Sequence, residues 1–213
     1  MADRVVSFDD ERLILVDTND VVIGYETKRH AHRGFGLLHR AFSIFLISPT
    51  HGVLMQRRAA DKPLWPLYWS TSCCSHPRKG EGYSSAAQRR LDEELGLVVE
   101  LRSLFQLRYW AGFEDIGAER ESCRVLIGQV ADASSVRANA SEIADWIWIE
   151  PDALDHWASR QPKQFTPWFR LQWQRLRSSD AVPELRWRRP RRVMVPPARR
   201  ITVGSLGLDA SQA

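Results

Sequence analysis

The chain has 213 residues, of which 44% are hydrophobic and 26% are charged, so it suits one globular domain and is not a collagenous, disordered or disulfide-scaffold protein. Its formal net charge of +4 comes from the tail, because residues 1–177 hold 23 basic and 23 acidic side chains whereas residues 178–213 hold 7 and 3. A neutral domain is not expected to bind specific nucleic acid. The longest apolar run, residues 41–47, is far below the roughly 18 residues of a membrane span.

The N-terminus and the cysteines indicate the compartment. The first twelve residues are acidic, where a signal peptide is basic and then apolar, so export is not expected. Cys73, Cys74 and Cys123 are odd in number and include an adjacent pair, which suits reduced thiols and no disulfide framework. We therefore expect a cytoplasmic protein.

The first half of the domain is predicted to contain two β-hairpins, each formed by β-branched runs around turn residues. The first pairs residues 12–16 with 21–25, and the second pairs residues 40–47 with 53–58. Residues 59–69, with two prolines and three aromatic side chains, are predicted to form an ordered loop.

A helix is predicted next, over residues 85–95. Ser85 with Gln88 three positions later forms a capping-box pattern, apolar residues recur on one helical face, and Gly96 would end the helix. Strands are expected at 101–110, at 119–130 and at 146–149, followed by two helices that each begin with proline, at 151–157 and 167–177.

This order of elements predicts an α+β fold in which mixed β-sheets are flanked by helices. The expected domain covers residues 1–177. Beyond it, residues 178–213 are rich in arginine and proline and end in a polar segment, so they are expected to form a flexible basic extension.

Five side chains of metal-binding type stand at separate places in the sequence: His32, His39, His76, Glu119 and Glu121. Imidazoles and carboxylates together suit a divalent ion such as Zn²⁺, Mn²⁺ or Mg²⁺. The two glutamates are two positions apart, so on a strand they share one face and would repel each other without a cation. The alternative is a solvated strand face with ordinary polar histidines.

Other reactive positions have both a chemical and a structural interpretation. In an extended segment Cys74 and His76 share one side, which places a thiol beside an imidazole; the alternative is a structural cysteine pair. Cys73 is interpreted as packing. Arg90 and Glu94, one helical turn apart, predict by themselves a surface ion pair worth a few tenths of a kcal/mol.

The segment from Ser75 to Leu97 resembles the Nudix box, in which a loop and a helix present glutamates to a magnesium ion that bridges a diphosphate. The matching positions are Glu81, Arg89, Leu91, Glu93, Glu94, Gly96 and Leu97. Two positions depart from the box, because Ser75 replaces its first glycine and Arg90 replaces a glutamate of the hydrolases. A cation at position 90 removes a metal ligand and argues against ordinary diphosphate hydrolysis.

Residues 12–176 resemble the type 1 isopentenyl-diphosphate Δ-isomerases, which are Nudix relatives. The resemblance rests on separated motifs in the family order: KRHAH with LLHRAF, QRRAADKPLWP, WSTSCCSHP, RRLDEELG, ERE and FTPWF. It implies a Nudix-like single domain and an enzyme of isoprenoid biosynthesis that interconverts isopentenyl and dimethylallyl diphosphate through a tertiary carbocation.

The resemblance also implies the binding residues. One divalent metal, Mn²⁺, Zn²⁺ or Mg²⁺, would be held by His32, His39, His76, Glu119 and Glu121. A Mg²⁺ ion that clamps the diphosphate would be held by Glu94 and the backbone carbonyl of Cys74. The phosphate oxygens would be neutralised by Lys28, Arg58 and Lys62, although by sequence alone such cations are more often solvated.

The implied catalytic pair is Cys74 and Glu121, on opposite faces of the substrate, with Tyr109 assisting beside Glu121. Trp168 would turn its ring toward the cation, where cation–π attraction contributes about 1 to 2 kcal/mol or more in a dry site; the alternative for this tryptophan is core packing. The expected partner is a small allylic or homoallylic diphosphate bound by a monomer.

Two other functions remain open. A Nudix diphosphohydrolase would release orthophosphate or a nucleotide monophosphate. A non-catalytic protein would bind metal or diphosphate, with the basic tail touching RNA or anionic membrane by nonspecific charge.

Overall fold

The computed structural model describes residues 4–179 and residue 182. The predicted basic extension, residues 178–213, lies outside the described residues except for positions 178, 179 and 182. The strands are β1 (Arg12–Val16), β2 (Val22–Thr27), β3 (His39–Ser48), β4 (Gly52–Arg58), β5 (Trp69–Ser70), β6 (Cys73–Ser75), β7 (Leu101–Phe113), β8 (Gly117–Gln129) and β9 (Ile143–Ile149). The helices are α1 (Lys28–Ala31), α2 (Tyr83–Leu95), α3 (Pro151–Arg160) and α4 (Pro167–Arg177).

Strand β3 is the centre of a mixed nine-stranded sheet. It pairs antiparallel with β1, β4 and β6 and parallel with β8. Because neighbours cover it on both edges and on both faces, almost every residue of β3 is buried, which explains why its sequence is a nearly continuous apolar run. The α+β fold predicted from the sequence is confirmed.

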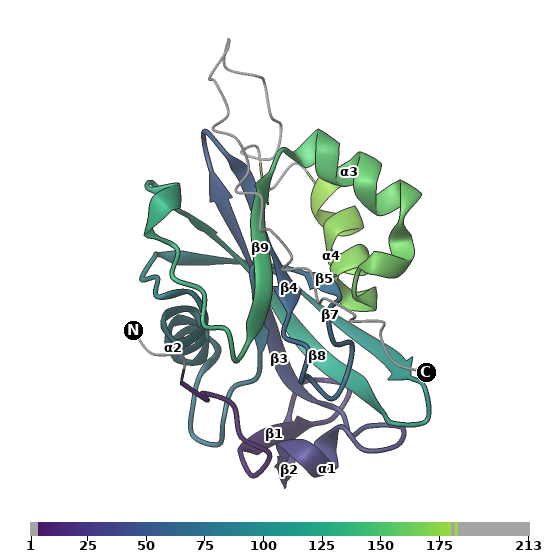
Figure 1. Ribbon diagram of the computed structural model, residues 1–213. Coiled ribbons are helices and arrows are strands. Elements are labelled where there is room, and N and C mark those ends of the chain that lie inside the picture. Colours follow the sequence, from purple (N-terminus) through teal and green to yellow (C-terminus); the bar gives the residue numbers. More distant parts are fainter. Residues whose placement is uncertain (1–3, 180–181, 183–213) are drawn as a thin grey trace, which may run out of the picture.

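Helices cover both faces of this sheet (Figure 1). On one face α2 packs Leu91 and Leu95 into a core that includes Ile44 of β3. On the other face α4 packs Phe169 against Phe45 of β3, with the ring centroids 6.4 Å apart. Alternate residues of β3 therefore contribute to two different cores.

The first predicted hairpin is confirmed by the pairing of β1 with β2. The second is confirmed only beside its turn, where Ile47 pairs with Val53 and Ser48 with Gly52. Beyond these pairs β4 turns away and pairs with β9 and β5. The turn requires glycine at position 52, because φ is +89° and a Cβ there would lie 2.2 Å from the carbonyl oxygen of Ile149.

The predicted capping box of α2 is wrong. The helix begins at Tyr83 with Gly82 as its N-cap, so Ser85 lies inside the first turn and its hydroxyl donates to the Gly82 carbonyl at 3.1 Å. Gln88 donates to the Leu97 carbonyl instead of reaching back to the N-terminus. The predicted end is confirmed, since Gly96 has φ of +64° in the left-handed region.

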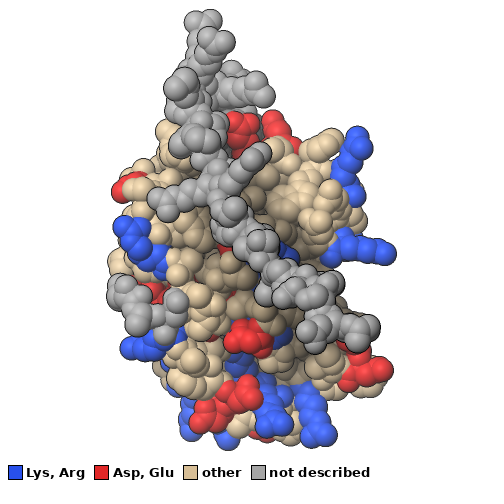
Figure 2. Space-filling view, viewed as in Figure 1, with Lys and Arg blue, Asp and Glu red and all other residues tan. Residues whose placement is uncertain are grey.

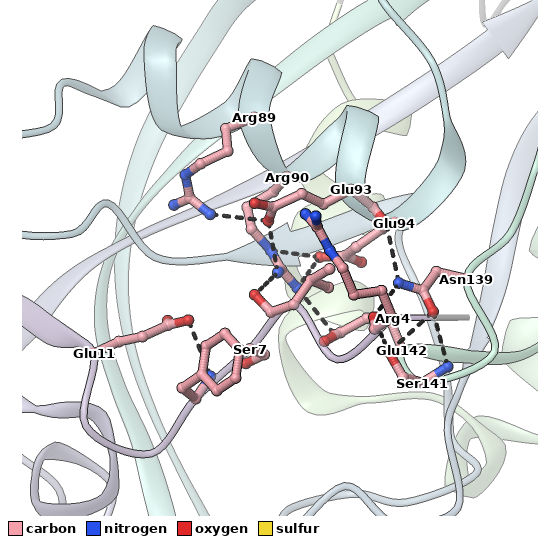
Figure 3. Close-up of polar contacts among 12 residues, drawn as sticks. Arg4, Ser7, Glu11, Arg89, Arg90, Glu93, Glu94, Asn139, Ser141 and Glu142 are labelled. Carbon is pink, nitrogen blue, oxygen red and sulfur yellow. Dashed lines mark hydrogen bonds and ion pairs between the residues drawn. The ribbon is translucent and has the colours of Figure 1, made fainter. Parts of the chain in front are cut away.

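The side chains of Arg90 and Glu94 do not form the surface ion pair that their spacing predicts. They are 3% and 2% exposed, and the Arg90 guanidinium donates to Glu94, at 2.7 Å, and contacts Glu93 and Glu142, each at 3.0 Å. Arg90 also donates to the Val6 carbonyl at 2.8 Å, so the N-terminal segment closes over the network (Figure 3).

On the face shown in Figure 2, basic and acidic side chains are interspersed among other residues, as the neutral charge of residues 1–177 predicts. Within the part of the chain that the structure describes, no helix is long and apolar enough to cross a membrane.

We expect Arg90→Met to lower the free energy of unfolding by about 3 to 5 kcal/mol, because it leaves buried carboxylates without their counter-charge. The matched control is Arg89→Met. Arg89 lies one position earlier on α2, and its side chain is 20% exposed and pairs with Glu81 and Glu93, so we expect a loss of about 1 kcal/mol. Urea-induced unfolding measures both values, and equal losses would contradict the buried network.

Candidate active site

A cavity of about 100 Å³ opens between the sheet, α2 and α4 and gathers side chains that are far apart in the sequence. Its lining residues are Lys28, His32, Gln56, Arg58, Lys62, Pro63, Leu64, Cys74, Ser75, His76, Arg90, Glu94, Tyr109, Glu119, Glu121, Glu142 and Trp168. These include every site residue predicted from the sequence except His39, which is fully buried beside His32 and His76.

Pairing of β3 with β8 brings two of the metal-type side chains together, because His39 is the register partner of Glu121. Glu119 lies two positions earlier on β8, on the same face. His32 follows α1 and His76 follows β6, which pairs with β3. The ligand atoms of these five residues all lie within 4.8 Å of one another.

Gly117 allows the start of β8 to approach the segment that carries His32. The backbone amide of Ala118 donates to the His32 carbonyl at 2.9 Å, and a Cβ at position 117 would lie only 2.3 Å from that carbonyl oxygen. A glycine at the start of β8 therefore allows the close approach that holds the His32 ring over the cluster.

The histidine rings are oriented by the backbone. His32 Nδ1 donates to the Lys28 carbonyl and His39 Nδ1 donates to the Leu37 carbonyl, each at 2.7 Å, which leaves both Nε2 atoms for the cluster. His39 Nε2 is buried and has no hydrogen-bond partner. Backbone acceptors that fix the tautomer are the usual support of metal-binding histidines, so this donor set fits a divalent cation.

The pKa shifts of the clustered side chains also favour a bound cation. Burial, followed by repulsion from Glu119, raises the pKa of Glu121 well above its ordinary value. Burial, followed by repulsion from His32, lowers the pKa of His39 to about 3. Burial opposes the charge of Glu119, but the combined attraction of the three histidines, of which His32 at 2.8 Å contributes most, lowers the pKa of Glu119. A cation would displace the proton of Glu121 and relieve the carboxylate repulsion.

The alternative of a solvated strand face is wrong for this cluster. Glu119 and Glu121 are 7% and 6% exposed and His39 is fully buried. Buried imidazoles and carboxylates need partners; His32 pairs with Glu119 and His76 with Glu121, whereas His39 Nε2 is left for a ligand.

Glu121 is held by two other groups of the cavity. The Tyr109 hydroxyl donates to one carboxylate oxygen, and Tyr109 is its cross-strand neighbour on β7. His76 Nε2 lies 3.1 Å from the other oxygen. Burial, followed by the charge of Glu121, raises the pKa of Tyr109 well above its ordinary value, so the phenol keeps its proton and acts as a donor.

Cys74 and Trp168 lie on the same cavity wall. The indole N–H of Trp168 points toward the Cys74 sulfur at 3.4 Å, and its ring stacks on Tyr109 with centroids 6.2 Å apart. Trp168 is only 2% exposed and contacts core residues as well as the cavity, so core packing and a place in the site coexist. Cys73, by contrast, is fully buried in the core under α2, as its interpretation as packing predicts.

Lysines gather at the end of the cavity near α2. Lys28 contacts the Ser7 hydroxyl, and burial, followed by repulsion from Lys62, lowers the Lys28 pKa. The Lys62 ammonium lies 2.5 Å from Glu142. The charge of Lys62 is partly neutralised by Glu142. An anion that carries more charge than one carboxylate can therefore attract these lysines.

Arg58, which also lines the cavity, is oriented by backbone carbonyls. Its guanidinium donates to the carbonyls of Trp65 and Leu64 at 3.0 and 2.9 Å and lies 5.5 Å from the centroid of the Trp168 ring. The loop that carries these carbonyls is part of residues 59–69, whose ordered structure is confirmed.

Glu94 faces this cation cluster from α2. Burial, which outweighs the attraction of Arg90, raises the Glu94 pKa. A second cation would stabilise the ionised carboxylate, so Glu94 fits a metal that also contacts a bound anion.

Sequence reasoning missed two residues of the cavity. Glu142, in the loop before β9, joins Lys62 to Arg90 but carries no local motif. Gln56 is 3% exposed and its side-chain oxygen has no hydrogen-bond partner. Its place directly before two arginines in the QRRAADK motif is the one signal that could have marked it.

Comparison with known proteins gives consistent results. The NUDIX domain family model matches residues 37–169. The isopentenyl-diphosphate Delta-isomerase of Burkholderia multivorans is 42% identical over 160 residues, covering 75% of this chain and 89% of the relative. That of Halorhodospira halophila is 40% identical over 161 residues, covering 75% and 91%.

Solved structures show the same fold. The MutT protein from Methanosarcina mazei superposes with a TM-score of 0.55 at 13% identity, covering 66% of this chain and 94% of that one. A Deinococcus radiodurans protein superposes with a TM-score of 0.56 at 23% identity, covering 70% and 90%. With the sequence relatives, the fold and the composition of the cavity in agreement, the chain belongs to the Nudix family and, within it, to the isopentenyl-diphosphate Delta-isomerases.

Proposed function

We propose that this chain interconverts isopentenyl diphosphate and dimethylallyl diphosphate, a step of isoprenoid biosynthesis. The observation that carries the proposal is that the Cys74 thiol and the Glu121 carboxyl line one cavity together with the cations Lys28, Arg58 and Lys62. Moving the double bond adds a proton at one carbon and removes a proton from another. Two proton-transfer groups in one enclosed site meet that need.

Cys74 and Glu121 are the proton-transfer pair in this proposal. Glu121 lines the cavity with Cys74, and Tyr109 and His76 fix its two oxygens. The intermediate is a tertiary carbocation, which survives only where water is excluded. Trp168, buried beside the sulfur, presents aromatic surface to that charge.

The diphosphate is assigned to the end of the cavity with Lys28, Arg58 and Lys62. Lys62 exchanges its contact with Glu142 for a phosphate oxygen, and Arg58 is already oriented by its two carbonyl contacts. The His32, His39, His76, Glu119 and Glu121 cluster is assigned one divalent metal, and Glu94 with the Cys74 carbonyl a Mg²⁺ ion. When bound, these ions supply charge that orients Glu121 and neutralises the diphosphate.

Diphosphate hydrolysis is the weaker alternative. The position where the hydrolases of the Nudix family carry a glutamate holds Arg90, whose guanidinium is surrounded by three carboxylates. A buried cation at this place repels a metal ion, so fewer ions can gather around the phosphates. Hydrolysis would also leave the cysteine without a role.

Cys74→Ala and Glu121→Gln are each expected to lower the isomerisation rate by about 1000-fold or more, because each removes a proton-transfer group. The measurement is proton NMR of isopentenyl diphosphate incubated with Mg²⁺ and the purified protein. Cys73→Ala is the matched control, since the adjacent thiol is buried in the core, and it should stay close to the wild-type rate. Release of phosphate with no dimethylallyl isomer would establish the hydrolase instead, and full activity of Cys74→Ala would favour a non-catalytic role of this thiol.

Removal of the metal by a chelator is expected to abolish isomerisation, and added Mn²⁺, Zn²⁺ or Mg²⁺ should restore it. His39→Asn should lower the metal content per chain, measured by plasma mass spectrometry, because His39 Nε2 loses its place among the ligands. His51→Asn is the control, since His51 lies in an exposed turn. Unchanged metal content in His39→Asn would exclude this histidine as a ligand.

A further inference from the structure

The buried side of the Cys74 sulfur is surrounded by hydrogen-bonding groups. The nearest is the Thr71 hydroxyl, followed by the Trp168 indole nitrogen at 3.4 Å, the Ser70 hydroxyl at 3.5 Å and the Ser43 hydroxyl at 3.6 Å. Thr71, Ser70 and Ser43 are 0 to 1% exposed, so bulk water does not compete for these contacts.

Thr71 has a second acceptor within reach. Its hydroxyl also lies 3.2 Å from the Cys73 carbonyl oxygen, with donor geometry. A hydroxyl has one proton and two lone pairs. It can donate to the Cys73 carbonyl while it accepts from the Cys74 thiol, or it can rotate and donate to the sulfur.

We propose that Thr71 is a positioning residue for Cys74 that keeps the sulfur hydrogen-bonded both with and without its proton. This inference rests on the proposed function. When Cys74 carries its proton, the S–H donates to Thr71 Oγ1 and the threonine proton goes to the Cys73 carbonyl. For the transfer the S–H turns from Thr71 to the substrate, and the S–H bond breaks as a C–H bond forms. The threonine O–H then turns to the sulfur, and the reverse transfer restores the first arrangement. No proton leaves the threonine.

The other neighbours of the sulfur are less suited to this exchange. The Trp168 N–H is a donor only and is shared with the Ser70 hydroxyl at 3.1 Å. Ser70 is also within 3.1 Å of the Thr166 hydroxyl, and Ser43 lies 3.5 Å from Cys123. Among the described residues, Thr71 therefore makes the shortest contact with the sulfur and has a carbonyl that receives its proton in the alternate state.

The backbone around Thr71 is held independently of its hydroxyl. The next residue, Ser72, accepts from the Leu46 amide at 2.8 Å and donates to the Leu54 carbonyl at 2.6 Å. The loop between β5 and β6 is thus anchored to β3 and β4. Removing the Thr71 hydroxyl is expected to leave the loop in place and to change only what the sulfur contacts.

The test compares Thr71→Val, which keeps the shape and removes the hydroxyl, with Thr71→Ser, which keeps the hydroxyl. We expect Thr71→Val to lower kcat by about 10- to 100-fold, the effect of losing one hydrogen bond to a charged group. KM should change by less than about twofold because the cations that bind the diphosphate are untouched. Thr71→Ser should recover most of kcat.

The second readout does not depend on isomerisation. The rate of Cys74 alkylation by iodoacetamide at one fixed pH, followed by peptide mass spectrometry, reports how well the loop supports the reactive sulfur. We expect it to fall in Thr71→Val and to recover in Thr71→Ser. Ser72→Ala removes a buried hydroxyl of the same loop that does not contact the sulfur, so its Tm should fall while its alkylation rate stays unchanged.

Wild-type kcat and alkylation in Thr71→Val would overturn the inference, and so would losses that serine does not restore or that Ser72→Ala reproduces. If Thr71→Val does not fold, the same measurements are made on Thr71→Ala and Thr71→Ser. If the wild-type protein fails to isomerise isopentenyl diphosphate, the proposed function fails. The alkylation rates still decide whether Thr71 supports the sulfur.

Discussion

The parallel pairing of β3 with β8 is the constraint on which the rest of the site depends. It places His39 opposite Glu121, and β7 then adds Tyr109 from the other edge of β8. Because β6 pairs with β3, Cys74 and His76 are delivered to the same end of the sheet. A shift of one residue in the β3–β8 register would turn Glu121 to the opposite face and separate it from its partners.

Buried charge is the second constraint, and the fold balances it locally. The cavity contains carboxylates, imidazoles, lysines and arginines that are largely removed from water. Such groups are tolerated only where counter-charges or hydrogen bonds replace the lost solvent. The N-terminal segment contributes to this balance, since its carbonyl at Val6 accepts from Arg90 and its Ser7 hydroxyl contacts Lys28. The site is therefore assembled from both ends of the domain.

Sequence reasoning predicted well what local patterns determine. Most of the long strands, the start of α3, the extent of α4 and the end of α2 at Gly96 follow from periodicity, proline and glycine. The short elements α1, β5 and β6 were not predicted, α3 runs on to Arg160, beyond its predicted end at residue 157, and β9 begins at Ile143, before its predicted start at residue 146. The two-residue spacing of Glu119 and Glu121 implies their shared strand face, whereas the three histidines were grouped with them by chemical kind and by the family resemblance. Contacts that depend on distant segments were not predictable in this way. Glu142 joins the network through loop packing, and Arg90 becomes buried because residues 4–8 cover it.

The Nudix helix also shows how one substitution shifts the chemistry of a shared fold. In the box that residues 75–97 resemble, carboxylates on the helix gather metal around the phosphates. Here Arg90 places a positive charge among Glu93, Glu94 and Glu142, and of the α2 carboxylates it is Glu94 that lines the cavity. In the proposed function, this arrangement favours binding of the diphosphate over its cleavage. The proposed proton-transfer groups, Cys74 and Glu121, lie on β6 and β8, whereas two of the three cations assigned to the diphosphate, Lys28 and Lys62, lie outside the strands of the sheet.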